Sequence, residues 1–240
     1  MKIEINNVSK SFGKNKIIKN VSMNINSGEV ICFLGPSGSG KTTLIRLILG
    51  AIKTENGKIL IGETAVPSLS LISKIGYMPQ NDALYNDLTA SENLNFFAGL
   101  YNIPSKDLNK MQDEALAVVN LINDKNKLVS KFSGGMKKRL SLAIAIQHKP
   151  DVLLLDEPTV GIDPILKHSI WKEFMKLKEQ GKTLIVSTHV MDEIINCDKA
   201  GLIYSGELIE FDTIQNLLSK TKSGKIEELF LNISKGGDMQ

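Results

Sequence analysis

Apolar and polar residues alternate in two early segments of the chain, residues 3–8 and 21–25. Such alternation predicts strands with one buried face, because successive side chains of a strand point to opposite sides. The sequence Glu-Asn-Gly at 55–57 is typical of a hairpin turn, and an apolar strand is expected to follow it at 58–61. We therefore predict antiparallel strands on both sides of the intervening segment.

Three short apolar runs, at residues 30–34, 152–155 and 183–186, show no polar alternation. Strands of this kind are buried on both faces, which is typical of a parallel sheet covered by helices. A helix is expected between the last two runs, over residues 164–180, and Gly181 ends it.

Helical spacing of apolar residues also predominates from about residue 88 to 128, where 91–94 opens one segment and 113–122 forms another. The sequence shows no repeat, low-complexity tract or linker. We therefore predict one α/β unit over residues 1–240, with a mainly parallel sheet, an antiparallel β lobe and a helical lobe at about 84–146.

The composition is that of an ordinary globular protein, since 42% of the 240 residues are hydrophobic and 23% are charged. A net charge of +3 gives little attraction to nucleic acid, so we expect no nucleic-acid partner. No run of about 18 apolar residues is present, and residues 1–10 lack the apolar core of a secretion signal. Cys32 and Cys197 suggest no disulfide framework, and Cys32 is expected to be a small buried hydrophobe. These features predict a cytosolic chain.

A glycine-rich segment that contains a lysine joins the apolar run at 30–34 to a helix-like stretch at 44–49. It matches every fixed position of the P-loop pattern, in which backbone N–H groups and a helix N-terminus surround phosphate oxygens. The pattern assigns Lys41 to the β- and γ-phosphates and the Thr42 hydroxyl to Mg²⁺. A plain glycine turn is the alternative. The predicted nucleotide-binding segment, called the glycine loop below, contains Gly35, Pro36, Ser37, Gly38, Ser39, Gly40, Lys41, Thr42 and Thr43.

Two adjacent carboxylates, Asp156 and Glu157, follow the apolar run at 152–155. Parallel strands end at the same edge of a sheet, so we expect this pair near the glycine loop. Because neighbouring strand residues point in opposite directions, we predict separate roles. Asp156 would hold Mg²⁺, and Glu157 would orient and deprotonate the attacking water. An acidic turn before Pro158 is the alternative.

The segment Phe132-Ser133-Gly134-Gly135-Met136 precedes a predicted helix that runs through 137–146. It resembles the Leu-Ser-Gly-Gly-Gln signature of the ATP-binding cassette (ABC) family, whose members have a P-loop NTPase core. The resemblance covers nearly the whole chain and places further family motifs in the same order. These are Phe12 at the adenine-stacking position, Gln80 in the Q-loop, Asp163 in the D-loop and His189 at the switch position.

The resemblance implies that the protein is an ATPase with ATP and Mg²⁺ as its cofactors. The implied catalytic residues are Lys41, Glu157 and His189. The implied metal ligands are Thr42, Gln80 and Asp156, and Phe12, Gln80 and Asp163 are implied to contact the nucleotide. The softer motifs have alternatives, with Phe12 as a core aromatic, Gln80 as a surface turn residue and His189 as a structural histidine. His148 and His168 match no motif and are interpreted as solvated or helix-surface residues. The basic cluster at 137–139 is interpreted as a helix face, with attraction to phosphate as the alternative.

A glycine loop contacts one side of ATP, and many P-loop enzymes receive a second group at the γ-phosphate from a partner. The resemblance implies that Ser133, Gly134 and Gly135 of a second copy supply it from a helix N-terminus, where the dipole favours anions. ATP would then lie between two chains in a head-to-tail dimer. Phe132 and Met136 depart from the usual leucine and glutamine, but the three inner residues are intact, so we expect activity to persist.

These motifs and the ending at 226–231 resemble most closely the bacterial exporters of drugs, antibiotics, lipids or polysaccharides. The resemblance implies an integral membrane permease as a partner and a place on the cytoplasmic side of the cell membrane. One alternative is an ABC protein that acts on ribosomes or DNA, which usually carries two cassettes or a long coiled-coil insertion. Another is a small-molecule P-loop kinase, which would not need Ser133–Gly135 or His189.

Large apolar residues lie close to Gln80 in the sequence, namely Leu84, Tyr85, Leu88, Phe96 and Phe97. The loop at 81–87 is otherwise polar, so Leu84 and Tyr85 have little core to enter. Exposed apolar groups among polar ones are typical of partner sites. We predict that the membrane partner docks here. Packing into the core of the helical lobe is the alternative, and it is favoured for Phe96 and Phe97.

Overall fold

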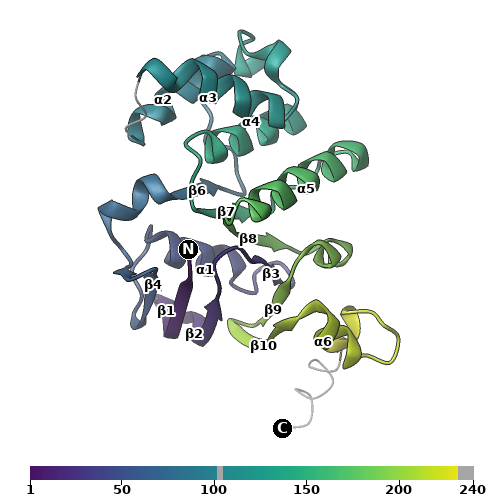
Figure 1. Ribbon diagram of the computed structural model, residues 1–240. Helices are drawn as coiled ribbons and strands as arrows, with labels where there is room; N and C mark the ends of the chain where they lie inside the picture. Colours follow the sequence, from purple (N-terminus) through teal and green to yellow (C-terminus); the bar gives the residue numbers. More distant parts are fainter. Residues whose placement is uncertain (102–104, 232–240) are drawn as a thin grey trace.

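The computed structural model describes residues 1–101 and 105–231 (Figure 1). The strands are β1 (Ile3–Phe12), β2 (Asn15–Ile25), β3 (Val30–Leu34), β4 (Asn56–Ile61), β5 (Thr64–Ala65), β6 (Ile75–Met78), β7 (Val152–Asp156), β8 (Thr183–Thr188), β9 (Lys199–Tyr204) and β10 (Glu207–Thr213). The α-helices are α1 (Lys41–Leu49), α2 (Ala90–Leu100), α3 (Ser105–Val118), α4 (Gly134–Ile146), α5 (Pro164–Glu179) and α6 (Ile214–Ser219). Short 3₁₀ helices are η1 (Leu69–Lys74), η2 (Ile122–Asp124), η3 (Val129–Lys131) and η4 (Met191–Asn196).

The larger sheet has six strands in the order β10-β9-β3-β8-β7-β6, and only the β10–β9 pair is antiparallel among its described ladders. Every residue of β3, β7 and β8 is buried, as expected for strands covered on both faces. The predicted, mainly parallel sheet is therefore confirmed. Because β3 lies between β8 and β9, the glycine loop leaves an interior strand of the sheet.

A smaller antiparallel sheet, in the order β2-β1-β4-β5, confirms the predicted β lobe. The hairpin turn predicted at 55–57 is wrong, because Asn56 already pairs with Ser9 in the β1–β4 ladder. The register shifts at this point, and Gly57 has a φ of 79°. A Cβ at Gly57 would lie 2.3 Å from the carbonyl oxygen of Asn6. The glycine therefore serves a β-bulge inside the ladder.

Buried apolar residues form cores on both faces of the larger sheet. One face packs with α5 and with the helical lobe of α2, α3 and α4, which lies at the top of the view in Figure 1. This core contains Leu94, Leu116 and Trp171. The other face packs with α1 and the antiparallel sheet, through residues such as Ile5 and Ile45. Each layer therefore buries its apolar side against the strands that lead to the glycine loop.

The helix boundaries follow local capping. Helix α2 begins at a capping box, in which the Thr89 hydroxyl accepts the N–H of Glu92 and the Glu92 carboxylate accepts the N–H of Thr89. The predicted segment at 113–122 is displaced, because α3 begins at Ser105 and residues 122–124 form a 3₁₀ turn. The first half of α3 carries few apolar residues, so its periodicity was a weak signal.

The interpretation of His148 as a helix-surface residue is wrong. Its ring stacks on Tyr101 with the centroids 3.7 Å apart, and its Nε2 lies 3.2 Å from the carbonyl oxygen of Ile75. Burial lowers the pKa of His148 to about 4, so the imidazole is neutral at neutral pH. The stack joins the ends of α2 and α4 to β6. His168, in contrast, is exposed on α5 as predicted.

Candidate nucleotide site

The backbone of the glycine loop depends on two of its glycines. A Cβ at Gly35 would lie 2.1 Å from the carbonyl oxygen of Ile203, so only glycine lets the loop leave β3 this close to β9. Gly40 has a φ of 110° and precedes α1. Among the described residues, no side chain caps this helix start. The first N–H groups of α1 therefore face the loop ready for an anion.

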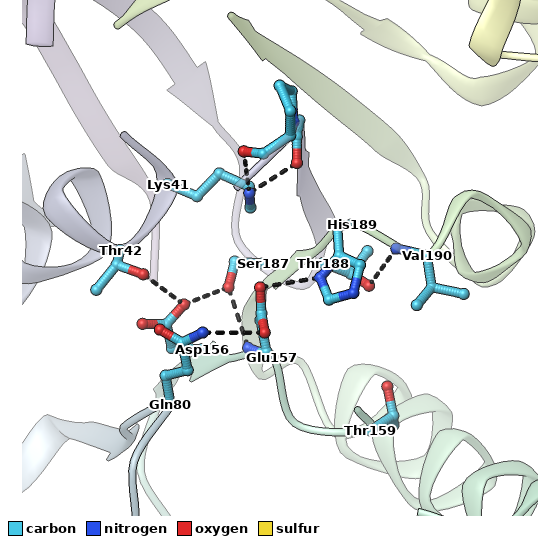
Figure 2. A network of polar contacts seen from close by, with 12 residues as sticks. Lys41, Thr42, Gln80, Asp156, Glu157, Thr159, Ser187, Thr188, His189 and Val190 are labelled. Carbon is cyan, nitrogen blue, oxygen red and sulfur yellow. Dashed lines mark hydrogen bonds and ion pairs between the residues drawn. The ribbon is translucent and has the colours of Figure 1, made fainter. Parts of the chain in front are cut away.

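The ammonium group of Lys41 lies inside the glycine loop. It donates hydrogen bonds to the carbonyl oxygens of Gly35 at 2.7 Å and Pro36 at 2.9 Å (Figure 2). Burial lowers the pKa of Lys41, and the carboxylates of Glu157 and Asp156 act in the opposite direction. A buried cation that faces two carboxylates and uncapped N–H groups is well placed to bind phosphate.

A cavity of about 360 Å³ opens over the glycine loop. Its lining includes nine of the predicted site residues, namely Phe12, Ser37, Gly38, Gly40, Lys41, Thr42, Thr43, Gln80 and Glu157. Gly35, Pro36 and Ser39 do not line the cavity as described, but the carbonyl oxygens of Gly35 and Pro36 hold the ammonium group of Lys41. Phe12 lies next to the turn between β1 and β2 and is 51% exposed, so the alternative of a core aromatic is wrong.

The buried carboxylate of Asp156 lies at the end of β7 beside Thr42. One of its oxygens accepts hydrogen bonds from the hydroxyls of Thr42 at 3.1 Å and Ser187 at 2.5 Å. Its other oxygen, Oδ2, is buried and has no hydrogen-bond partner within residues 1–101 and 105–231. Carboxylate and hydroxyl oxygens are the protein ligands that Mg²⁺ prefers, so this pair fits the predicted cation. The described ranges contain no cluster of three or more His, Cys, Asp or Glu side chains that could hold a metal ion by themselves.

The side chain of Glu157 lines the cavity and contacts residues that follow β6 and β8. It accepts a hydrogen bond from Gln80 Nε2 at 3.1 Å and lies 3.0 Å from His189 Nδ1 (Figure 2). Its backbone has a φ of 52°, which is uncommon for a residue other than glycine. The backbone N–H of Glu157 is held by the carbonyl oxygen and the hydroxyl of Ser187. Strain of this kind clusters at functional sites.

Four predicted nucleotide contacts outside the glycine loop do not line the cavity of their own chain as the structure describes it. Ser133 and Gly134 are exposed at the start of α4, where the Ser133 hydroxyl accepts the N–H of Met136. Gly135 follows them in the first turn of α4. Asp163 is exposed at the start of α5, and its carboxylate accepts the N–H of Leu166. Within this chain, Ser133 and Asp163 cap helices.

Sequence reasoning missed three residues that shape the site. Ser187 contacts both acidic positions, and Ile17 lines the cavity. Lys138, interpreted as part of a solvent-facing helix surface, is half-buried, and Glu157, Asp82 and Asp156 lie within its electrostatic reach. Burial lowers the pKa of its ammonium group. A polar residue directly after an apolar run, as at Asp156, was the available signal for Ser187, whereas Ile17 and Lys138 required the tertiary structure.

The described part of the chain, which leaves out 102–104 and 232–240, has no helix with the length and apolar character needed to span a bilayer.

Comparison with known proteins places this geometry in a family. The sequence profile described as ABC transporter matches residues 18–160. The linearmycin resistance ATP-binding protein LnrL of Bacillus subtilis is 37% identical, over 95% of this chain and 74% of its own length. The Nod factor export ATP-binding protein I of Rhizobium meliloti is 34% identical, over 98% of this chain and 70% of its own length.

The chain spans about a third of the length of two Dictyostelium discoideum relatives, ABC transporter G family members 20 and 23. Among solved structures, a dimeric post-hydrolysis state of an ATP-binding cassette bound to ADP and Pi superimposes with a TM-score of 0.82. The two sequences are 28% identical, and the superposition covers 88% of this chain and 98% of that cassette. The matched profile extends over more than half of the residues and includes the glycine loop and the acidic pair. The chain belongs to the ABC transporter family.

Proposed function

We propose that this chain binds ATP with Mg²⁺, hydrolyses it, and powers export of a substrate through a separate membrane subunit. The proposal rests on Lys41 and Glu157, which line one cavity, and on Asp156, which is hydrogen-bonded to Thr42 in the same lining. The loop after β3 leads to Lys41, and the end of β7 supplies Asp156 and Glu157, so phosphate-binding, metal-binding and proton-accepting groups meet at one edge of the sheet. The names of the relatives favour transport over the ribosome or DNA alternative.

In this proposal each group has one task. Lys41 and the N–H groups of α1 bind the β- and γ-phosphates. Thr42, Asp156 and Gln80 hold Mg²⁺, which when bound would neutralise phosphate charge. Glu157 accepts a proton from the attacking water. His189, which contacts the same carboxylate, keeps Glu157 and the γ-phosphate aligned.

A second copy of the chain would complete each site. The exposed N-terminus of α4, with Ser133, Gly134 and Gly135, offers N–H groups and a helix dipole to the γ-phosphate of the opposite copy. Asp163, exposed at the start of α5, would lie at the same interface. The dimeric state of the related cassette bound to ADP and Pi supports this arrangement.

The test of the proposed function is steady-state release of inorganic phosphate by the purified chain. Turnover of ATP is expected with excess Mg²⁺, and chelation by EDTA should lower it by about 10²-fold or more. Restoring Mg²⁺ should restore the rate. A chain that binds ATP but releases phosphate equally well in EDTA would contradict the assigned metal site. Transfer of the phosphate to a small molecule instead of water would favour the kinase alternative.

The membrane subunit is proposed to dock in a groove beside Gln80. A hollow of about 380 Å³ is lined there by Leu84, Phe97 and Leu100 from the helical lobe and by Tyr77 from β6. At its helical-lobe side, Tyr85 and Phe96 are half exposed and their ring centroids lie 4.6 Å apart. The core alternative is therefore wrong for Phe96, while Phe97 and Leu84 are partly buried against the core. An apolar groove with an aromatic edge fits a short helix from a partner.

Replacing Tyr85 with aspartate is expected to weaken assembly with the membrane subunit by about tenfold or more, because a charge would enter an apolar contact. Assembly is measured as integral membrane protein recovered per tagged chain from detergent-solubilised native membranes. Ile209→Asp is the matched control, since Ile209 is exposed on β10, at the sheet edge opposite β6. ATPase of the isolated Tyr85→Asp chain should equal that of the wild type. Undiminished assembly would exclude this docking surface.

A further inference from the structure

Glu193 is a buried carboxylate that the proposed mechanism does not use. It lies in η4, four residues after His189, and is 1% exposed. Its Oε1 accepts a hydrogen bond from the Thr159 hydroxyl at 2.5 Å and forms an ion pair with Lys167 at 2.6 Å. In the part of the chain that the structure describes, its Oε2 is buried with no hydrogen-bond partner.

Such a group is costly to bury for stability. Removing a carboxylate from water costs several kcal/mol, and a single cation seldom returns more than that cost. Here the cation, Lys167, keeps a side chain that is 28% exposed, and one carboxylate oxygen of Glu193 is left unpaired among the described residues. Buried ion pairs of this kind are better explained by the geometry that they specify.

The three partners belong to three segments around the nucleotide site. Glu193 follows the strand end that carries His189. Thr159 lies two residues beyond Glu157, on the segment that leaves the site toward α5 (Figure 2). Lys167 lies in the first turns of α5, and its backbone N–H bonds to the carbonyl oxygen of Asp163. One carboxylate therefore ties together the loops after β7 and β8 and the start of α5.

We infer that Glu193 is a positioning residue that fixes the positions of Glu157 and His189 relative to each other and to the start of α5. Glu157 has a backbone φ of 52°, a conformation that persists only when its surroundings over-determine it. Ser187 fixes the N–H of Glu157, and the Thr159–Glu193 bond fixes the chain two residues later. Because η4 begins only two residues after His189, the same bond limits movement of the imidazole away from Glu157. This inference rests on the proposed ATPase function.

The discriminating pair of variants is Thr159→Val and Thr159→Ser. Valine keeps the shape of threonine but removes the hydroxyl, whereas serine keeps the hydroxyl and loses a methyl group. Thr159→Val is expected to lower kcat for ATP by about 10–100-fold with an unchanged KM, since small misplacements of catalytic groups have effects of this size. Thr159→Ser should retain the wild-type kcat. The folded fraction at the assay temperature is measured by near-ultraviolet circular dichroism, and rates are expressed per folded chain.

A second variant keeps the test decisive if Thr159→Val does not fold. Lys167→Gln removes only the cation, at a partly exposed position, and should also lower kcat with an unchanged KM. A wild-type chain without ATPase would overturn the proposed function itself. An active wild-type chain whose Thr159→Val or Lys167→Gln variant is thermally destabilised but has an unchanged kcat per folded chain would overturn the positioning role. Equal loss of kcat in Thr159→Val and Thr159→Ser would overturn it as well, because the hydroxyl would then not be the cause.

Discussion

Replacing Glu157 with glutamine is expected to lower ATP turnover by about 10²–10⁴-fold while ATP binding persists. Glutamine has the same length and can still accept the hydrogen bond of Gln80, and its amide can donate to His189 Nδ1 once the imidazole carries its proton on Nε2. What it cannot do is accept the proton of the attacking water. Since substitution at this position leaves the Cβ in place, the backbone conformation at φ 52° costs the same in both chains.

Because it hydrolyses ATP slowly, the Glu157→Gln chain should also accumulate as an ATP-bridged dimer. Gel filtration with Mg²⁺ and ATP is expected to show the Glu157→Gln chain at twice the mass that it has without nucleotide. Glu63→Gln is the matched control, because Glu63 is exposed between β4 and β5, away from the cavity. It should hydrolyse ATP at the wild-type rate. A Glu157→Gln chain that remains monomeric while saturated with ATP would contradict the head-to-tail dimer.

Lys41→Ala is expected to abolish measurable turnover and to weaken ATP binding by about 10²-fold. The lost contact is a buried, charge-assisted one, which is worth about 1.5–3 kcal/mol, well above an exposed ion pair. Titration calorimetry measures the binding change, and phosphate release measures the turnover. Lys53→Ala, which removes an exposed lysine outside the cavity, should leave both unchanged.

The Lys41 variant needs one further measurement. Its ammonium group also holds the carbonyl oxygens of Gly35 and Pro36, so alanine could relax the loop as well as remove a phosphate contact. Thermal unfolding without nucleotide separates the two effects. An unfolding midpoint close to that of the wild type, with binding lost, assigns the effect to phosphate. Turnover at the wild-type rate would refute the assignment of Lys41.

The parts of the fold that could be predicted are those in which local pattern and burial agree. The runs that became β3, β7 and β8 are short, continuous and apolar, and such runs form buried parallel strands. Once those strands are parallel, their ends share one edge. The proximity of Thr42 and Asp156, 114 positions apart in the sequence, followed from that rule.

The parts that could not be predicted depend on contacts between distant segments. Gly57 looks like a turn residue in sequence, but pairing of β4 with β1 places it in a bulge. His148 is not part of an apolar pattern in the sequence. It is buried against Tyr101 because the ends of α2 and α4 pack beside β6. The hydrogen bond of Glu193 with Thr159 and its ion pair with Lys167 connect the segment after β8 to the segment after β7 and to α5. No local signal encodes such partnerships.

The interior position of β3 also has a consequence for the order in which the protein is made. Val30 pairs with Leu184 of β8, and Ile31 pairs with Lys199 of β9. At about 5–20 residues per second, synthesis of the intervening chain takes on the order of 10–30 seconds, during which β3 lacks both neighbours. Its buried-type sequence, Val-Ile-Cys-Phe-Leu, must remain shielded in that interval or risk association with other nascent chains. The pairing of β3 with β8 can therefore be completed only after Thr188 has left the ribosome.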